Sequence, residues 1–201
     1  MVKEFNILIT GVGGQGVILM SELLGKAAIA DGLRVKGSEV LGMAVRGGSV
    51  TSIIRLGEDV YGPLIPVGKC DTLIGMEPSE ALRNTSYLSK SGLVILNTVP
   101  IIPFTVSLGQ SKYPNLDQIL GKLNGIASKI IKLDAAQIAQ DAGSLLATNV
   151  VMLGALFGTE LFPIKMLTIQ EAIQTRFPAK IASVNIKAFE LGYQAYQQVV
   201  K

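Results

Sequence analysis

Short apolar runs and helical spacings alternate along the first third of the chain. Residues 5–10 form an apolar run that leads into glycines, which is typical of a buried parallel strand. Residues 17–30 carry apolar side chains at helical spacing, and residues 33–36 are predicted to form a second strand. A strand, a glycine loop, a helix and a strand in this order predict the opening of a βαβ unit.

The middle of the chain departs from a plain alternation of strands and helices. Alternate side chains of residues 49–56 share one face, a turn follows at 57–59, and residues 60–62 have an extended pattern. We therefore predict a hairpin inserted into the α/β order, which makes the sheet mixed. A helix is predicted to begin at Pro78. Further buried strands are predicted at residues 71–76, 93–97 and 129–133. An irregular connection is marked by Pro100, Pro103 and Pro114.

The last third of the chain is predicted to be helical. Asp134 with Gln137, and Thr168 with Glu171, have the spacing of a capping box at a helix start. Residues 149–157 are apolar on nearly all sides. The final helix is amphipathic, with a stripe of Val184, Ala188, Leu191, Ala195 and Val199. We predict a single three-layer, Rossmann-like α/β domain over residues 1–201, with a mixed, mainly parallel sheet and a helical C-terminal part.

The composition changes this picture from a monomer to a subunit. The chain of 201 residues is 49% hydrophobic and 16% charged, with a mean hydropathy of +0.46, which is more apolar than an ordinary soluble monomer. A membrane span would need about 20 consecutive apolar residues, and the longest run, 150–157, is far shorter. We therefore expect no membrane association and an apolar surface that a partner covers. Such a face would also allow the isolated chain to self-associate.

Two residue types are nearly missing, and this limits the chemistry. The sequence has no histidine and one cysteine, Cys70. It therefore offers no imidazole base, and it can build neither a four-thiolate iron–sulfur site nor a structural zinc site. We expect no catalytic residue and no metal ligand in this chain, with any redox centre on another polypeptide. The single cysteine and an N-terminus without secretory features favour a cytoplasmic location. A net charge of +3 from scattered basic residues favours acidic or phosphate-bearing partners over nucleic acid.

The sharpest local motif is the loop Gly11-Val12-Gly13-Gly14-Gln15-Gly16, which lies between a predicted strand and a predicted helix. Glycines there permit positive φ and leave room for a phosphate, and the following helix presents free N–H groups to an anion. The loop is either a site for a nucleotide, pyrophosphate or coenzyme A, or only a tight turn. An NAD(H) site would also need an acidic residue at the end of the second strand. Arg34 and Lys36 occupy that strand instead, which weakens this interpretation.

A second motif, Gly42-Met43-Ala44-Val45-Arg46-Gly47-Gly48-Ser49, leads into the predicted hairpin. Arg46 could direct its guanidinium at a carboxylate or phosphate while Gly47 and Gly48 let the backbone approach closely. The alternative is an ordinary loop with a surface arginine. Because both glycine motifs adjoin strand ends, we expect them to face the same edge of the sheet. Asn97 and Asn149 could add polar groups there or simply act as caps.

These segments resemble the gamma-type domain of 2-oxoacid:ferredoxin oxidoreductases. The resemblance runs over essentially the whole chain and is carried first by residues 9–17 and 39–50. Further segments are similar to the beta subunit of the indolepyruvate branch, namely residues 57–62, 77–83, 148–151 and 188–192. The resemblance implies a heteromeric complex that oxidatively decarboxylates a 2-oxoacid, with coenzyme A as acyl acceptor and ferredoxin as electron acceptor. It places thiamine diphosphate and the iron–sulfur clusters on a large partner subunit.

The resemblance also suggests which residues meet a ligand. Gly11, Gly13, Gly14, Gln15 and Gly16 would approach a phosphate-bearing ligand such as coenzyme A, and Arg46, Gly47 and Gly48 would line the subunit boundary. Indolepyruvate relatives often have Gly-Met-Ser-Gln-Arg where this chain has Ala44-Val45 before the arginine. The loss of two polar side chains leaves the identity of the 2-oxoacid open. Two rival hypotheses remain, a stand-alone oxidoreductase that uses NAD(P) or flavin, and a purely structural subunit.

Overall fold

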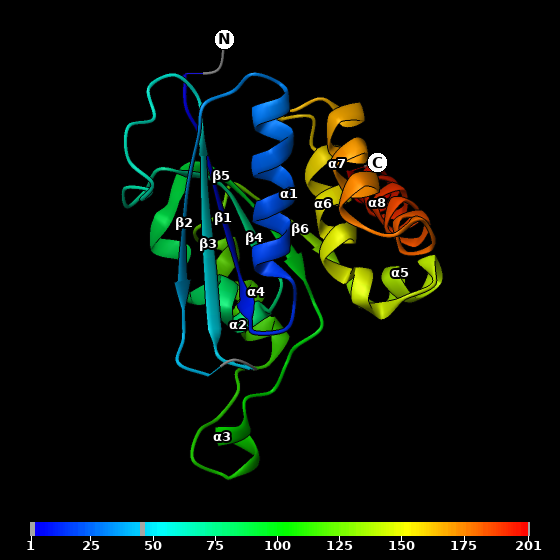
Figure 1. Ribbon diagram of the computed structural model, residues 1–201. Helices are drawn as coiled ribbons and strands as arrows, with labels where there is room; N and C mark the ends of the chain where they lie inside the picture. The colour runs from blue at the N-terminus through cyan, green and yellow to red at the C-terminus, as the bar shows by residue number, and fades with distance from the viewer. Residues whose placement is uncertain (1–2, 45–46, 201) are drawn as a thin grey trace.

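A computed structural model of the protein describes residues 3–44 and 47–200 and shows a twisted sheet between two layers of helices (Figure 1). The strands of the described residues lie in the order β2-β3-β1-β4-β5-β6. Their bounds are β1 Phe5–Val12, β2 Val35–Leu41, β3 Ser49–Leu56, β4 Cys70–Gly75, β5 Leu88–Asn97 and β6 Lys129–Leu133. The α-helices are α1 Val17–Ala30, α2 Pro78–Arg83, α3 Phe104–Ser107, α4 Leu116–Asn124, α5 Ala135–Ala142, α6 Thr148–Gly158, α7 Met166–Arg176 and α8 Ala179–Val200, and the 3₁₀ turns are η1 Thr85–Tyr87 and η2 Leu145–Ala147.

The sheet is mixed and mainly parallel, as predicted. β1, β4, β5 and β6 run parallel to one another, whereas β3 is antiparallel to both of its neighbours, β1 and β2. The predicted hairpin between residues 49–56 and 60–62 is wrong, because β3 forms its hairpin with the preceding strand β2. With β1 on its other edge, β3 has no free edge for residues 60–62. Instead, Gly57 turns the chain at φ 126°, and Asp59 N donates to Lys3 O.

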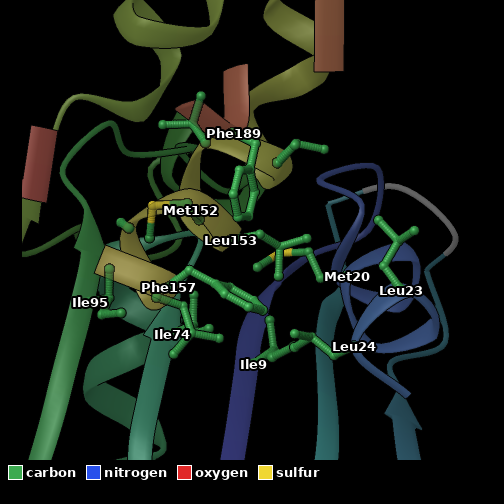
Figure 2. Close-up of a cluster of buried hydrophobic side chains, with 14 of the residues drawn as sticks. Ile9, Met20, Leu23, Leu24, Ile74, Ile95, Met152, Leu153, Phe157 and Phe189 are labelled. Carbon is green, nitrogen blue, oxygen red and sulfur yellow. The ribbon is translucent and has the colours of Figure 1, made fainter. Parts of the chain in front are cut away.

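The core has two parts because successive side chains of a strand point to opposite faces. Ile7, Ile9, Ile74 and Ile95 point toward α1 and the C-terminal helices, and Leu8, Leu73 and Val94 belong to the core on the other face, beneath α2 and α4. Figure 2 shows the larger part, where Phe157 and Phe189 pack edge to face with ring centroids 5.4 Å apart. No helix in the described part of the chain is both long and apolar enough to cross a membrane.

The helix α6 is central to this core, since every residue from Asn149 to Gly158 is buried. It packs against α8 at a distance set by two glycines. A Cβ at Gly154 would lie 2.0 Å from Phe189 O, and one at Gly192 would lie 2.0 Å from Val151 O. The two helix backbones therefore touch directly, which no larger side chain at either position would allow.

The helix caps agree only in part with the sequence prediction. Asp134 accepts from Gln137 N at 2.9 Å, but the Gln137 side chain donates to Asp141, so only half of the predicted capping box forms. The predicted box at Thr168 and Glu171 is wrong, because α7 already begins at Met166. Along α8, the predicted stripe is buried at Ala188 but has left the core by Val199.

Asp31, the residue after α1, fixes the start of α7. Its carboxylate accepts from Lys165 N at 2.7 Å and from the Thr168 hydroxyl at 2.8 Å. Burial acts to raise the pKa of Asp31, but these hydrogen bonds outweigh it and hold the pKa below its ordinary value of 3.8. The carboxylate therefore stabilises the fold above that value, and this contribution is lost as the pH falls through the folded-state pKa.

We expect Asp31→Asn to lower the free energy of unfolding by about 1 kcal/mol at neutral pH, because the hydrogen bonds lose their charge. The difference between variant and wild type should shrink as the pH falls through the folded-state pKa of Asp31, because the wild-type carboxyl group is then protonated as well. Urea unfolding of both proteins at neutral and low pH measures this. Glu190→Gln, which removes an exposed carboxylate on α8, should leave the neutral-pH stability unchanged. An equal gap at both pH values would contradict the role of the charge.

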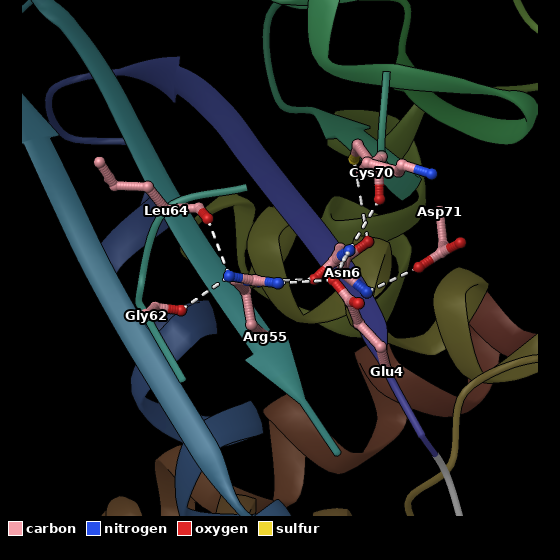
Figure 3. A network of polar contacts seen from close by, with 8 residues as sticks. Glu4, Asn6, Arg55, Gly62, Leu64, Cys70 and Asp71 are labelled. Carbon is pink, nitrogen blue, oxygen red and sulfur yellow. Dashed lines mark hydrogen bonds and ion pairs between the residues drawn. The ribbon is translucent and has the colours of Figure 1, made fainter. Parts of the chain in front are cut away.

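A polar network lies at the end of the sheet where the parallel strands begin (Figure 3). The buried Arg55 donates to Asn6 Oδ1 at 2.9 Å and to the carbonyls of Gly62 and Leu64, and it pairs with Glu4. Hydrogen bonds from Asn6 and Arg55 lower the pKa of Glu4. These contacts hold residues 57–69 against the sheet. The network thus accounts for the segment that the sequence assigned to a hairpin.

Candidate functional site

The candidate site lies at the carboxyl ends of β1 and β4. After β1 the chain passes into α1 on one face of the sheet, and after β4 it passes into α2 on the other face. The two connections therefore diverge between neighbouring parallel strands, which is where open α/β sheets bind their ligands. The glycine loop follows β1 directly, so the sequence motif and the topology mark the same place.

Two loop positions require glycine for a physical reason. Gly14 and Gly16 have φ of 100° and 77°, which side chains other than glycine rarely adopt. A Cβ at Gly16 would also lie 2.4 Å from Asn149 Nδ2, whereas one at Gly14 would meet nothing within 4 Å. Among the described residues no side chain caps α1, and the first N–H groups of a helix have no partner within it. The loop therefore offers backbone donors and the positive end of a helix dipole to an anion.

The structure brings the two glycine motifs together, as the sequence predicted. Gly13 N donates to Gly48 O at 2.8 Å, and Gly47 N donates to Gly13 O at 3.3 Å. Gly47 has φ of 71°. Val45 and Arg46 lie outside the described residues, so the proposed contact of Arg46 with a ligand stays a prediction.

Gln15 holds the loop in place. Its side-chain Oε1 accepts from Val12 N and its Nε2 donates to Met76 O, both at 2.8 Å. Asn97 donates to the same carbonyl at 3.0 Å and accepts from Ala135 N, which starts α5. The ends of β1, β4 and β5 are thus tied to one another and to α5. The side chain of Gln15 shapes the loop, and its predicted contact with a ligand stays untested.

Two hollows flank the loop and share Gly14 and Gly16. The hairpin-side hollow, of about 480 Å³, lies between the start of α1 and the β2–β3 turn and includes Leu41, Gly42 and Ala44. The α6-side hollow, of about 490 Å³, lies between the loop, the end of β5 and the start of α6. Its wall includes Ala136, Leu145 and Leu146, which the sequence analysis missed. No local pattern marks them, because only the packing of α5 and η2 brings them to the loop.

A buried carboxylate supports the site from the other face. Glu77 caps α2 by accepting from Glu80 N at 2.9 Å, and it also accepts from Ile101 N at 3.4 Å and from the Tyr113 hydroxyl. Burial, together with Glu77, raises the pKa of Tyr113. Glu80 accepts from the Ser49 hydroxyl at 2.6 Å. The first turn of α2 therefore joins the β2–β3 turn to the segment after β5. No role for Glu77 was predicted from the sequence, because two of its partners, Ile101 and Tyr113, are 24 and 36 residues away.

The residues present do not fit an iron–sulfur cluster. Cys70 is the first residue of β4, at the end of the strand away from the glycine loop. Burial raises the pKa of its thiol to about 12. A protonated, buried thiol is a poor cluster ligand, since the thiolate is the binding form. Within residues 3–44 and 47–200, no group of His, Cys, Asp or Glu side chains could hold a metal ion.

Comparison with known proteins places the sequence in a family. Residues 6–195 match the family described as pyruvate ferredoxin/flavodoxin oxidoreductase. The chain is 45% identical over 199 residues to the indolepyruvate oxidoreductase subunit IorB of Thermococcus kodakarensis, with 98% of both chains covered. This relative confirms the resemblance to the indolepyruvate branch.

Solved structures share the fold. The gamma subunit of the keto/oxoacid ferredoxin oxidoreductase of Geobacter sulfurreducens superposes with a TM-score of 0.70 at 23% identity, over 96% of this chain and 99% of that one. The 2-oxoglutarate:ferredoxin oxidoreductase of Magnetococcus marinus, solved with 2-oxoglutarate, coenzyme A and succinyl-CoA, gives 0.74 at 20% identity. The match covers 98% of this chain but only 32% of the Magnetococcus chain. By its sequence match over nearly all its length, the chain belongs to the pyruvate ferredoxin/flavodoxin oxidoreductase family.

Proposed function

We propose that this chain is the clusterless subunit of a thiamine-dependent 2-oxoacid:ferredoxin oxidoreductase, and that residues 1–201 form its gamma-type domain. The complex would oxidise a 2-oxoacid, release its carboxyl group as CO₂, transfer the acyl group to the thiol of coenzyme A and pass the electron pair to ferredoxin. The 45% identical indolepyruvate relative supports indolepyruvate as the first 2-oxoacid to test. Thiamine diphosphate, on the partner, would supply the carbanion stabilisation that decarboxylation needs.

The observation that carries this proposal is the glycine loop at the point where the connections of β1 and β4 diverge. Its backbone is free of Cβ atoms at Gly14 and Gly16, and it leads into a helix that no described side chain caps. A pyrophosphate such as that of coenzyme A fits this donor set, because it is an anion and needs close backbone approach. Gln15, Asn97 and Gly48 would keep the loop in shape through the hydrogen bonds described above.

The fold gives less support to the rival hypothesis of a nicotinamide enzyme. In such enzymes an acidic residue at the end of the strand that follows the first helix binds the ribose. Here β3 separates β2 from β1, so Glu39 on β2 lies one strand further from the loop.

Reconstitution tests the proposed function. The chain alone should show no turnover. Adding it to the candidate large subunit, which carries the thiamine and cluster motifs, should restore dye reduction that requires both a 2-oxoacid and coenzyme A. The large subunit alone is the control. If its activity is the same with and without this chain, the proposed role is wrong.

A further inference from the structure

A projecting arm extends the surface beside the candidate site. Residues 98–115 leave the end of β5, form α3 and return to α4, and they stand out beyond the carboxyl edge of the sheet (Figure 1). The segment contains one charged residue, Lys112, although 16% of the whole chain is charged. Ile101, Ile102, Phe104 and Leu108 expose their side chains on it. An exposed and almost uncharged arm is unusual for a surface that faces only water.

The arm has a defined shape despite its exposure. Within it, Leu108 N donates to Phe104 O at 3.1 Å and Gln110 N donates to Thr105 O at 2.9 Å. At its base, Ile101 N and the Tyr113 hydroxyl both donate to the buried carboxylate of Glu77. These hydrogen bonds fix the backbone of the arm, on which the apolar side chains are exposed. A surface that is ordered in advance loses less entropy when a partner binds it.

The arm and the β2–β3 hairpin are fixed to the same short helix. Both attach to the first turn of α2, the arm through Glu77 and the hairpin through the hydrogen bond from Ser49 to Glu80. We call the exposed apolar side chains of these two segments that lie next to the site the docking surface, and its members are Leu41, Met43, Ile101, Ile102, Phe104 and Leu108.

The size of the docking surface approaches that of a protein interface. Its side chains are between 40% and 106% exposed. At roughly 150–200 Å² for a fully exposed side chain of this size, they present about 570–760 Å². A standard interface buries about 800 Å² on each partner, whereas the largest apolar patch of a monomer is typically about 300–600 Å². The area therefore lies at or above the upper end of the range for a monomer and just below that of a standard interface.

The docking surface borders both hollows of the site. Leu41 lines the hairpin-side hollow and Ile101 lines the α6-side hollow. A partner seated on the surface would therefore also close the space around the glycine loop. A second copy of this chain would bring no reactive centre to the glycine loop. The sequence has no histidine, and its one cysteine, Cys70, lies at the other end of β4. The same fold is one third of a longer chain in the Magnetococcus enzyme, with a coverage of 32%.

We propose that the arm and the hairpin tip are the docking site for the thiamine-bearing subunit, which covers the glycine loop and completes the site between the two chains. The proposal rests on the proposed function for the identity of the partner. The part of the partner that meets the arm is an apolar protein surface with few charges, because the arm offers only Lys112 for ion pairing.

Charge substitutions on the arm test this in the assembled complex. We expect the double variant Phe104→Glu with Leu108→Glu to raise the Kd for the large subunit at least about thirtyfold, because buried aromatic anchors dominate interface affinity. Leu167→Glu is the matched control, since Leu167 is 66% exposed against 74% for Phe104 but lies at the start of α7, away from the arm (Figure 1). It should change the Kd less than about twofold. Isothermal titration gives the Kd, and the thermal midpoint of each variant shows that it is folded.

The possible results separate the two proposals. If the arm variant binds like wild type and still restores coenzyme A-dependent activity, the docking proposal fails and the proposed function stands. If wild type neither binds the large subunit nor alters its turnover, both fail. Sedimentation equilibrium of the chain alone examines the second-copy alternative. Self-association that the arm variant abolishes, with unchanged binding to the large subunit, would also overturn the docking proposal.

Discussion

Gly154→Val is expected to lower the free energy of unfolding by at least about 3 kcal/mol, because α6 and α8 touch through their backbones at this position. The added Cβ would lie 2.0 Å from Phe189 O and 2.9 Å from Tyr193 N. Neither atom is a flexible side-chain end, so the helices must move apart. All of the surrounding residues of α6 are buried, and a shift would therefore open the core on this face of the sheet. Urea unfolding followed by circular dichroism measures the change.

Gly25→Ala provides the matched control for a glycine in a helix. Gly25 lies inside α1, and a Cβ there would meet nothing within 4 Å. Alanine should therefore raise the stability by about 0.5–1 kcal/mol, because glycine loses more conformational entropy in a helix. An unfolding midpoint for Gly154→Val equal to that of wild type would show that the two helices can separate freely, against the packing described here.

Gly14→Asp is expected to weaken coenzyme A binding to the assembled complex by about two orders of magnitude, which is about 2.7 kcal/mol. The carboxylate would lie where the glycine loop is proposed to hold a phosphate. Two neighbouring negative charges repel strongly in a site that is closed to water. A Cβ at Gly14 would meet no neighbour within 4 Å, and the backbone strain from its φ of 100° is shared by the asparagine variant described next. Substitution of Gly13 would instead disturb its hydrogen bonds with Gly47 and Gly48. Titration of coenzyme A into the complex gives the affinity.

Gly14→Asn separates charge from shape. Asparagine and aspartate have nearly the same size, and both tolerate the positive φ of this position better than other side chains. The asparagine variant should therefore lose much less affinity than the aspartate variant. If both variants bind coenzyme A as wild type does, the loop is only a turn, and the chain would be a structural subunit. Equal losses in both would assign the effect to the backbone instead of to a phosphate.

The sequence by itself determined the elements whose signals are local. The predicted helix over residues 17–30 and the predicted strand over 129–133 have the same bounds in the structure. The reason is that apolar spacing directly reports the period of a helix or strand. The glycine loop was equally visible, because Gly14 and Gly16 occupy backbone conformations that few other residues adopt. The resemblance to the family followed from such segments in their order along the chain.

Only the tertiary structure decided which elements become neighbours. A strand pattern shows which face is buried but not which strand lies beside it, and so β3 was assigned to the wrong hairpin partner. Thr168 had the spacing of a cap, yet its hydroxyl meets Asp31, 137 residues away. The links from Gly13 to Gly48 and from Glu77 to Tyr113 likewise join distant segments. These contacts form through the packing of whole elements, and that packing is a long-range property which no local pattern of residues contains.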